Sequence, residues 1–320
     1  MSLALDRVTP QRSLSRALLL VGLLTFLAAA LGAGVPSTYG GRVAVDEPQY
    51  LLSALSLWED HDLDISDELA DRRYLAFHDA DLPVQTATRP DGSQLSPHDP
   101  LLPVLLAVPM GLGGWLAARL TLAALAGVLA GLLLWVAVRR FAVPPRPATV
   151  GVALATCTAP LTVYGQQVYP ELPGALAALV AVAALTAPRP TPRTLTVFAL
   201  AVIALPWLSV KYAPVGAALV LVALTRTPRR AAVGLLAALA AGGAVYLAAH
   251  KAIYGGITAY ASGDAFQGSG EFGVVGFHPN YPGRSIRLLG LAALGVVYYG
   301  TLLVTGWFGR TRWVLAPDDL

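Results

Sequence analysis

The sequence has few charged residues and a single cysteine. Only 13% of its 320 residues are charged and 56% are hydrophobic, whereas a typical soluble domain has about 25% charged residues. The formal net charge is +3 and the basic residues are spread along the chain, which does not favour a nucleic-acid partner. With Cys157 alone, a disulfide or a cysteine-ligated metal site within the chain is excluded. An ordinary soluble domain is excluded as well.

The apolar residues form uncharged runs about as long as a bilayer is thick. We therefore expect an all-α polytopic membrane protein of about eight transmembrane helices, forming a single membrane domain over residues 1–320 of a plasma (inner) membrane. If the arginines that flank the runs all face the cytoplasm, successive spans alternate in direction as the positive-inside rule requires, and both termini are cytoplasmic. The expected spans are residues 17–35, 120–138, 148–164, 172–187, 194–210, 212–225, 231–249 and 288–309.

Three segments leave alternatives open. Residues 101–118 are long enough to span, but a span there would place Arg139 and Arg140 outside, and Pro109 interrupts the run. We interpret this segment as re-entrant or surface-lying on the outer side. Residues 194–225 read better as a hairpin turning near Lys211 than as one tilted helix. The first run is an uncleaved helix or, less in keeping with its length, a signal peptide cleaved after a small residue such as Ala30.

The polar residues gather in outer loops. Residues 36–100 form an acidic extracytoplasmic loop, with a net formal charge of −10 between Asp46 and Asp99. A second outer loop covers residues 254–285, and the cytoplasmic connections are short. The first loop opens with apolar residues at helical spacing, which predicts an amphipathic helix on the membrane surface. Asp46 can be the N-cap of that helix and can also form, with Glu47, a carboxylate pair at the membrane edge, since the two interpretations are compatible.

Five short motifs follow one another along this topology. Their order resembles the GT-C class of integral membrane glycosyltransferases, in particular the bacterial relatives of protein O-mannosyltransferases and of lipid A aminoarabinose transferases. The motifs are DEPQYL at 46–51, EDHDLD at 59–64, SPHDPL at 96–101, VYPELP at 168–173 and PWLSVKY at 206–212. Relatives of this class continue with further helices beyond the point that corresponds to Leu320.

The resemblance implies an inverting transfer of a sugar from a polyprenyl-phosphate donor in the membrane to an extracytoplasmic glycan, lipid or protein. Asp46 would be the general base, and Glu47 would orient it, position the acceptor or help to hold a divalent ion such as Mg²⁺ or Mn²⁺. One carboxylate suffices because a departing phosphate needs cations rather than a proton. The candidates for binding the donor phosphate or sugar are His98, Arg119, Glu171, Lys211, Tyr212 and Arg284.

Each candidate also has a plainer interpretation. Lys211 lies in an apolar stretch, where a charge costs about 2.5–3.5 kcal/mol on insertion scales, yet it could snorkel from a helix end. Arg284 could contact lipid head groups, Glu171 could be a solvated turn residue, and His98 could begin a surface helix. Two rival functions remain open, namely a non-enzymatic flippase or transporter of the same lipid-linked sugar and an inactive scaffold subunit.

The acidic loop also imitates a calcium-binding loop. Asp60, Asp62 and Asp64 have the spacing of the first ligands, but Ile65 stands where the sharp turn needs glycine and Asp71 where a bidentate glutamate belongs. We therefore expect a solvated acidic loop rather than a calcium loop.

Overall fold

The computed structural model describes residues 11–37, 41–43, 46–82 and 85–263. They belong to the first of two compact units, Met1–Ala265; the second unit, Phe266–Leu320, lies outside the described residues, and so do the predicted span at 288–309 and Arg284. In the described part every regular element is a helix, and only three isolated β-bridges join loop segments. The predicted all-α class is confirmed to that extent.

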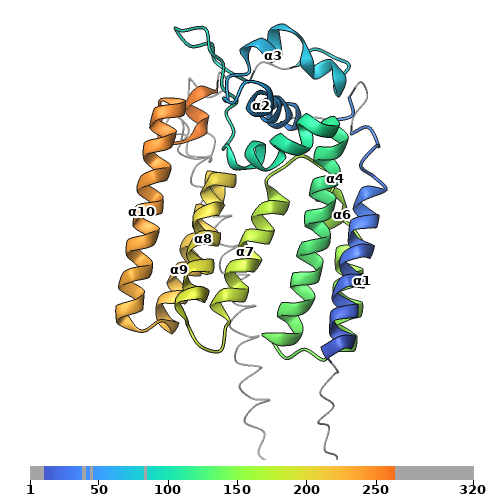
Figure 1. Cartoon of the computed structure of the whole chain (residues 1–320), viewed down its shortest axis with the longest axis vertical. Helices are drawn as coiled ribbons and strands as arrows, with labels where there is room; N and C mark the ends of the chain where they lie inside the picture. Colours follow the sequence, from blue (N-terminus) through green and yellow to red (C-terminus); the bar gives the residue numbers. More distant parts are fainter. Residues whose placement is uncertain (1–10, 38–40, 44–45, 83–84, 264–320) are drawn as a thin grey trace, which may run out of the picture. The chain divides into compact units, whose positions relative to one another are not determined.

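Within residues 1–265, the long helices run side by side and a smaller group of helices covers one end of the bundle (Figure 1). Among the described residues, three helices are long and apolar enough to cross a membrane, namely α1, α4 and α10, while α7 and α8 are shorter apolar helices. The eight-span topology goes beyond these three and stays a prediction. The bundle consists of α1 (Gln11–Ala30), α4 (Leu101–Arg139), α5 (Pro145–Thr156), α6 (Leu161–Tyr164), α7 (Glu171–Leu185), α8 (Pro192–Leu208), α9 (Ala213–Arg226) and α10 (Arg229–Tyr254).

Helix α4 is divided by a sharp bend. Gly113 (φ −146°, ψ 15°) and Gly114 (φ 64°, ψ −163°) leave the helical conformation, and the second combination is accessible in practice only to glycine. The first limb crosses beneath the covering helices, whereas the second runs down the bundle against α1 (Figure 1). The break falls at the glycine pair inside residues 101–118, so residues 115–118 belong to the same limb as the predicted span 120–138. The re-entrant or surface-lying placement of the first limb stays a prediction.

The run at 148–164, predicted as one span, forms two helices instead. Helix α5 ends at Thr156 and α6 begins at Leu161, because Pro160 between them has no N–H for a helical hydrogen bond and its ring clashes with the preceding turn. The buried hydroxyls of Thr25 and Thr156 form a 2.7 Å hydrogen bond at the end of α5. This polar contact joins α5 to α1 where the helix stops.

Helices α1 and α4 approach each other through glycine. A Cβ atom added to Gly127 would lie 2.6 Å from the Gly22 carbonyl oxygen, and one added to Gly22 would lie 2.9 Å from that of Gly127. Both separations are shorter than van der Waals contact. Small residues at such crossings allow apolar helices to pack backbone against backbone, where dispersion rather than water exclusion stabilises association.

The covering group contains α2 (Glu47–Glu59), α3 (Ser66–Ala70) and η1 (Arg73–Ala76). The prediction that α2 is an amphipathic helix on a membrane surface is wrong, because every residue from Glu47 to Ser56 is buried. The first limb of α4 lies on one side of α2 and the α3 segment on the other (Figure 1). Its leucines share one core with those of α4. The acidic loop therefore has a rigid interior helix.

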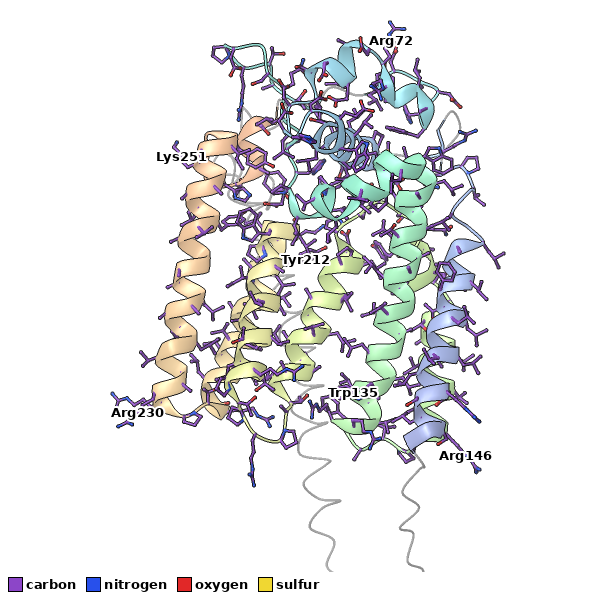
Figure 2. All side chains as sticks on the ribbon, viewed as in Figure 1. Arg72, Trp135, Arg146, Tyr212, Arg230 and Lys251 are labelled. Carbon is purple, nitrogen blue, oxygen red and sulfur yellow. The ribbon has the colours of Figure 1, made fainter. Side chains whose placement is uncertain are left out.

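The basic residues separate along the bundle as the charge pattern predicts. Arg146 and Arg230 lie at one end, and Lys251 and Arg72 lie at the other (Figure 2). Helices α8 and α9 are joined by the short η2 helix (Val210–Tyr212), so the predicted hairpin does turn at Lys211. The orientation relative to the cytoplasm stays a prediction.

Candidate functional site

Asp46 stands at the N-cap position of α2, but its side chain does not cap the helix. The half-buried carboxylate instead accepts a hydrogen bond through Oδ1 from Gln85 Nε2 at 3.1 Å. Among the described residues, Oδ2 has no hydrogen-bond partner. The predicted N-cap position is therefore confirmed, but the side chain makes no cap hydrogen bond, which forgoes about 1 kcal/mol. The orientation of its carboxylate is instead set by Gln85.

Gln85 links Asp46 to His98. His98 Nε2 donates to Gln85 Oε1 at 3.3 Å, so the amide relays between a ring nitrogen and the carboxylate. Burial lowers the pKa of His98, partly opposed by the negative charges of Asp46 and Asp99, while the positive charge of Lys211 lowers it further. The ring is therefore neutral at neutral pH and donates a single N–H to Gln85.

Tyrosines enclose this relay. The Tyr50 ring stacks on His98 with centroids 4.4 Å apart, and the Tyr169 ring meets Tyr50 edge-on at 6.4 Å. The Asp46 N–H donates to the Tyr169 hydroxyl at 3.4 Å. Burial raises the pKa of Tyr169 to about 12, and burial together with the charge of Asp46 also raises that of Tyr50. Both rings therefore stay neutral and present aromatic faces beside Asp46.

Lys211 and Glu171 form the second half of the site. Lys211 Nζ lies 2.6 Å from Glu171 Oε1, with the lysine side chain 45% exposed and the glutamate 30% exposed. The ammonium also lies 5.4 Å from the Tyr212 ring centroid. Glu171 Oε2 and the Tyr212 hydroxyl are buried and have no partner among the described residues. The charge of Lys211 acts on His98, so the two halves interact electrostatically, and this half contains two buried polar atoms without a partner in the described part of the chain.

A buried polar cluster supports both halves. Asp99 Oδ1 accepts hydrogen bonds from Tyr246 Oη at 3.0 Å and from His250 Nε2 at 2.9 Å, and Oδ2 accepts one from the Val210 N–H at 3.0 Å. Asp99 follows His98 in the chain, and Val210 precedes Lys211. The cluster therefore connects the acidic loop and the η2 turn to α10, and it fixes the position of the loop relative to the turn.

The second acid of the predicted pair faces the protein interior. Glu47 Oε1 lies 3.3 Å from Arg119 Nη2 and accepts the Val168 N–H at 2.8 Å, and both charged side chains are 1% exposed. Arg119 also donates to the carbonyls of Ala33 and Val35. This burial does not favour the predicted roles of Glu47 as a catalytic group beside Asp46 and of Arg119 as a ligand of the donor, and both roles stay predictions.

The same contacts test the predicted metal position. The Glu47 carboxylate is neutralised by Arg119 and bonded to a backbone N–H, and a positive guanidinium beside it opposes a divalent cation. Asp46 and Glu47 therefore do not fit a shared Mg²⁺ or Mn²⁺. The calcium-loop spacing fails too, since Asp62 accepts from Ser56 Oγ at 2.9 Å and Asp64 from the Gln94 N–H at 2.8 Å.

The structure thus brings together five of the sequence-predicted residues and adds others. Three contributors had not been singled out from the sequence. Gln85 carried no signal, but Tyr246 and His250 stand with Tyr254 at four-residue intervals on one face of an otherwise apolar helix, which marks a polar strip. The predicted residues that gather here are Asp46, His98, Glu171, Lys211 and Tyr212.

Comparisons of the chain with protein-family models, with curated proteins and with solved structures found no match. The roles below are therefore inferred from the geometry and the chemistry of the residues.

Proposed function

We propose that this chain is a membrane glycosyltransferase that moves a sugar from a polyprenyl-phosphate donor to an extracytoplasmic acceptor, with inversion at the anomeric carbon. The observation that supports this most is the state of the Asp46 carboxylate. One oxygen is oriented by Gln85 and the other has no partner among the described residues. A general base needs this combination of a fixed direction and a free lone pair.

The reaction requires one proton transfer and one displacement. The acceptor hydroxyl gives its proton to Asp46 Oδ2 while its oxygen bonds to the anomeric carbon from the face opposite the phosphate. The bond from that carbon to the phosphate oxygen breaks, and the polyprenyl phosphate departs with the electron pair. Because the phosphate is already a weak base, positive charge stabilises its departure without a second carboxyl group.

Lys211 supplies that positive charge. Its charge acts on His98, and it lies in the turn between two apolar helices, where a lipid-linked phosphate would enter. Glu171 holds the ammonium in place at 2.6 Å. The free oxygen of Glu171 and the Tyr212 hydroxyl would bind sugar hydroxyls, and the neutral rings of Tyr50 and Tyr169 would pack against the sugar.

The decisive experiment replaces the proposed base. Asp46→Asn keeps the size of the side chain and its bond to Gln85 but removes the proton acceptor. We expect sugar transfer from radiolabelled polyprenyl-phosphate sugars in membranes to fall by at least about 100-fold, with unchanged expression and melting temperature. Asp81→Asn, an exposed acid of the same loop, is the matched control and should transfer normally. Normal transfer by Asp46→Asn would remove the proposed base.

A second variant tests the donor side. Lys211→Met should weaken donor binding, raising KM for the polyprenyl-phosphate sugar more than for the acceptor, and should change stability by less than about 1 kcal/mol because the ion pair is exposed. Lys251→Met is the matched control, since that ammonium bonds the Gly255 carbonyl at 2.6 Å at the end of α10. Equal effects of the two variants would argue against a phosphate contact at Lys211.

The two rival functions separate in the same assay. A flippase would move the labelled lipid across the bilayer without releasing its sugar to an acceptor, and a scaffold subunit would do neither on its own. A wild-type protein that flips but does not transfer would therefore replace the present proposal with the first rival.

A further inference from the structure

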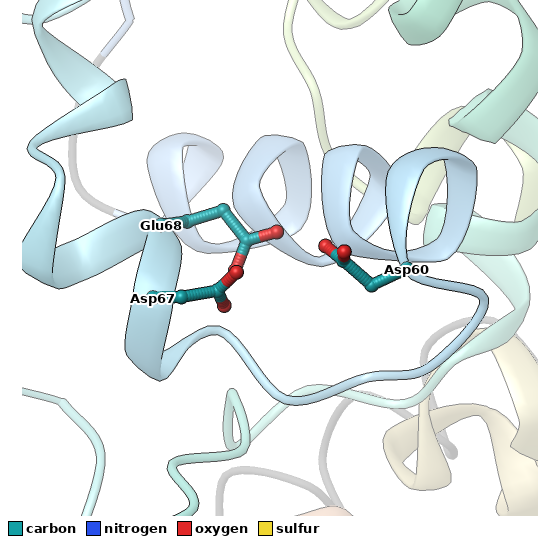
Figure 3. A group of neighbouring side chains, drawn as sticks. All are labelled: Asp60, Asp67 and Glu68. Atoms are coloured by element: carbon teal, nitrogen blue, oxygen red, sulfur yellow. The ribbon is translucent and has the colours of Figure 1, made fainter.

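Three acidic side chains meet in the acidic loop, away from the candidate site. Asp60 follows the end of α2, and Asp67 and Glu68 lie in α3. Their carboxylate groups point toward one another (Figure 3), and one oxygen of each lies within 4.8 Å of the others. Asp60 and Asp67 are exposed, whereas Glu68 is 2% exposed.

Glu68 is the unusual member of this group. Both of its carboxylate oxygens are buried, and neither has a hydrogen-bond partner in the described part of the chain. A buried anion without a partner is strongly unfavourable. Arg73, which follows α3 in the chain, is paired with Glu59 at 2.7 Å.

We propose that Asp60, Asp67 and Glu68 bind a divalent cation, with Ca²⁺ preferred. Calcium takes oxygen ligands at about 2.3–2.6 Å, so its coordination shell is about 4.8 Å across, and three oxygens within that separation reach one ion with small shifts. The shell of Mg²⁺, at about 2.0–2.1 Å, is tighter and demands octahedral geometry. Water completes the coordination on the exposed side, where Asp60 and Asp67 face solvent.

The site differs from the calcium loop suggested by sequence spacing. Asp62 and Asp64 are engaged in loop hydrogen bonds, and the second and third ligands come from α3 instead. An ion bound here joins the end of α2 to α3. It therefore fastens the outer part of the acidic loop to the buried helix.

The test uses the full chain, purified in detergent and stripped with EDTA. Adding CaCl₂ to millimolar concentration should raise the melting temperature by about 5 °C and should give saturable heat in titration calorimetry, whereas MgCl₂ should give less than half that shift. Glu68→Gln and Asp67→Asn should each abolish the response to calcium. Asp71→Asn, the matched control just beyond α3, should keep it.

Several results would overturn the site. Wild-type protein without calcium-dependent heat or shift would do so, and so would a Glu68→Gln variant that responds like the wild type. An equal response to magnesium would refute the calcium preference. The measurement reads ion binding and not sugar transfer, so its outcome is independent of the test of Asp46.

Discussion

Glu47 and Arg119 form a fully enclosed ion pair that joins α2 to the second limb of α4, with a nitrogen-to-oxygen distance of 3.3 Å. The carboxylate belongs to the residue next to the proposed base, yet it has different partners and accepts the Val168 N–H as well. The pair therefore fixes the start of α2, and with it the backbone that carries Asp46.

Removing the arginine should unfold the protein more easily. Arg119→Met leaves the Glu47 carboxylate buried without its counter-charge and frees the carbonyls that the guanidinium binds, so we expect a loss of about 3–5 kcal/mol in the free energy of unfolding. Denaturant titration in mild detergent measures it. Arg139→Met, at the exposed far end of the same helix, should change stability by less than about 0.5 kcal/mol. Comparable losses for the two variants would contradict the assigned role.

The glycine contact between α1 and α4 predicts a contrast between two alanine substitutions. A methyl group at Gly127 would lie 2.6 Å from the Gly22 carbonyl oxygen, whereas one at Gly131 would lie 3.6 Å from that of Leu18. Gly127→Ala should therefore destabilise the protein by about 1–3 kcal/mol. Gly131→Ala should be neutral or stabilising by up to about 1 kcal/mol, because alanine favours the helix. Thermal unfolding of both variants measures the difference, and equal melting temperatures would refute this packing.

The cluster around Asp99 predicts which of two substitutions, His250→Phe or Tyr246→Phe, destabilises the protein more. His250→Phe keeps a ring against Tyr246, whose centroid lies 3.8 Å away, but it removes the 2.9 Å bond to Asp99. We expect it to cost about 3 kcal/mol or more, because a buried carboxylate loses its strongest partner. Tyr246→Phe removes one hydroxyl donor and should cost about 1–2 kcal/mol. Chemical unfolding orders the two, and a larger loss for Tyr246→Phe would contradict this assignment.

His98 predicts a loss of stability in acid. Burial lowers its folded-state pKa below the ordinary value of 6.5, against the pull of Asp46 and Asp99 and with the help of Lys211. The unfolded chain therefore takes up the proton at a higher pH than the folded chain. Stability contributed by the neutral ring is complete above pH 6.5 and is lost as the pH falls through the lower folded-state pKa. Melting temperatures between pH 7.5 and 5 should fall more steeply for the wild type than for His98→Gln. Parallel profiles would exclude His98 as the source.

Asp46 and Glu47 illustrate what the sequence could predict and what it could not. Apolar spacing located a helix start at this pair, and the structure confirms it. A helix turns by 100° per residue, however, so neighbouring side chains face different surroundings. Which of the two meets Arg119 depends on a helix that begins more than fifty residues later. The local pattern holds no information about that encounter, and Arg119 was for the same reason predicted to bind a ligand.

The bundle shows the same division between local and distant effects. Flanking arginines predicted that Arg146 and Arg230 share an end, because charge is a property of each segment alone. Hydropathy merged residues 148–164 although Pro160 interrupts them, since an average over a window does not register one missing N–H. The spacing of Tyr246, His250 and Tyr254 marks a polar strip, but it does not indicate the Asp99 carboxylate that His250 contacts across the fold.

The corner in α4 has a consequence for how this chain can vary. Gly114 adopts a backbone geometry (φ 64°, ψ −163°) that side chains forbid, and beyond it the helix changes from crossing under α2 to descending beside α1. Gly114 therefore fixes the angle between the two limbs of α4. An alanine there would change this angle and shift the first limb, on which the covering helices pack, relative to the bundle.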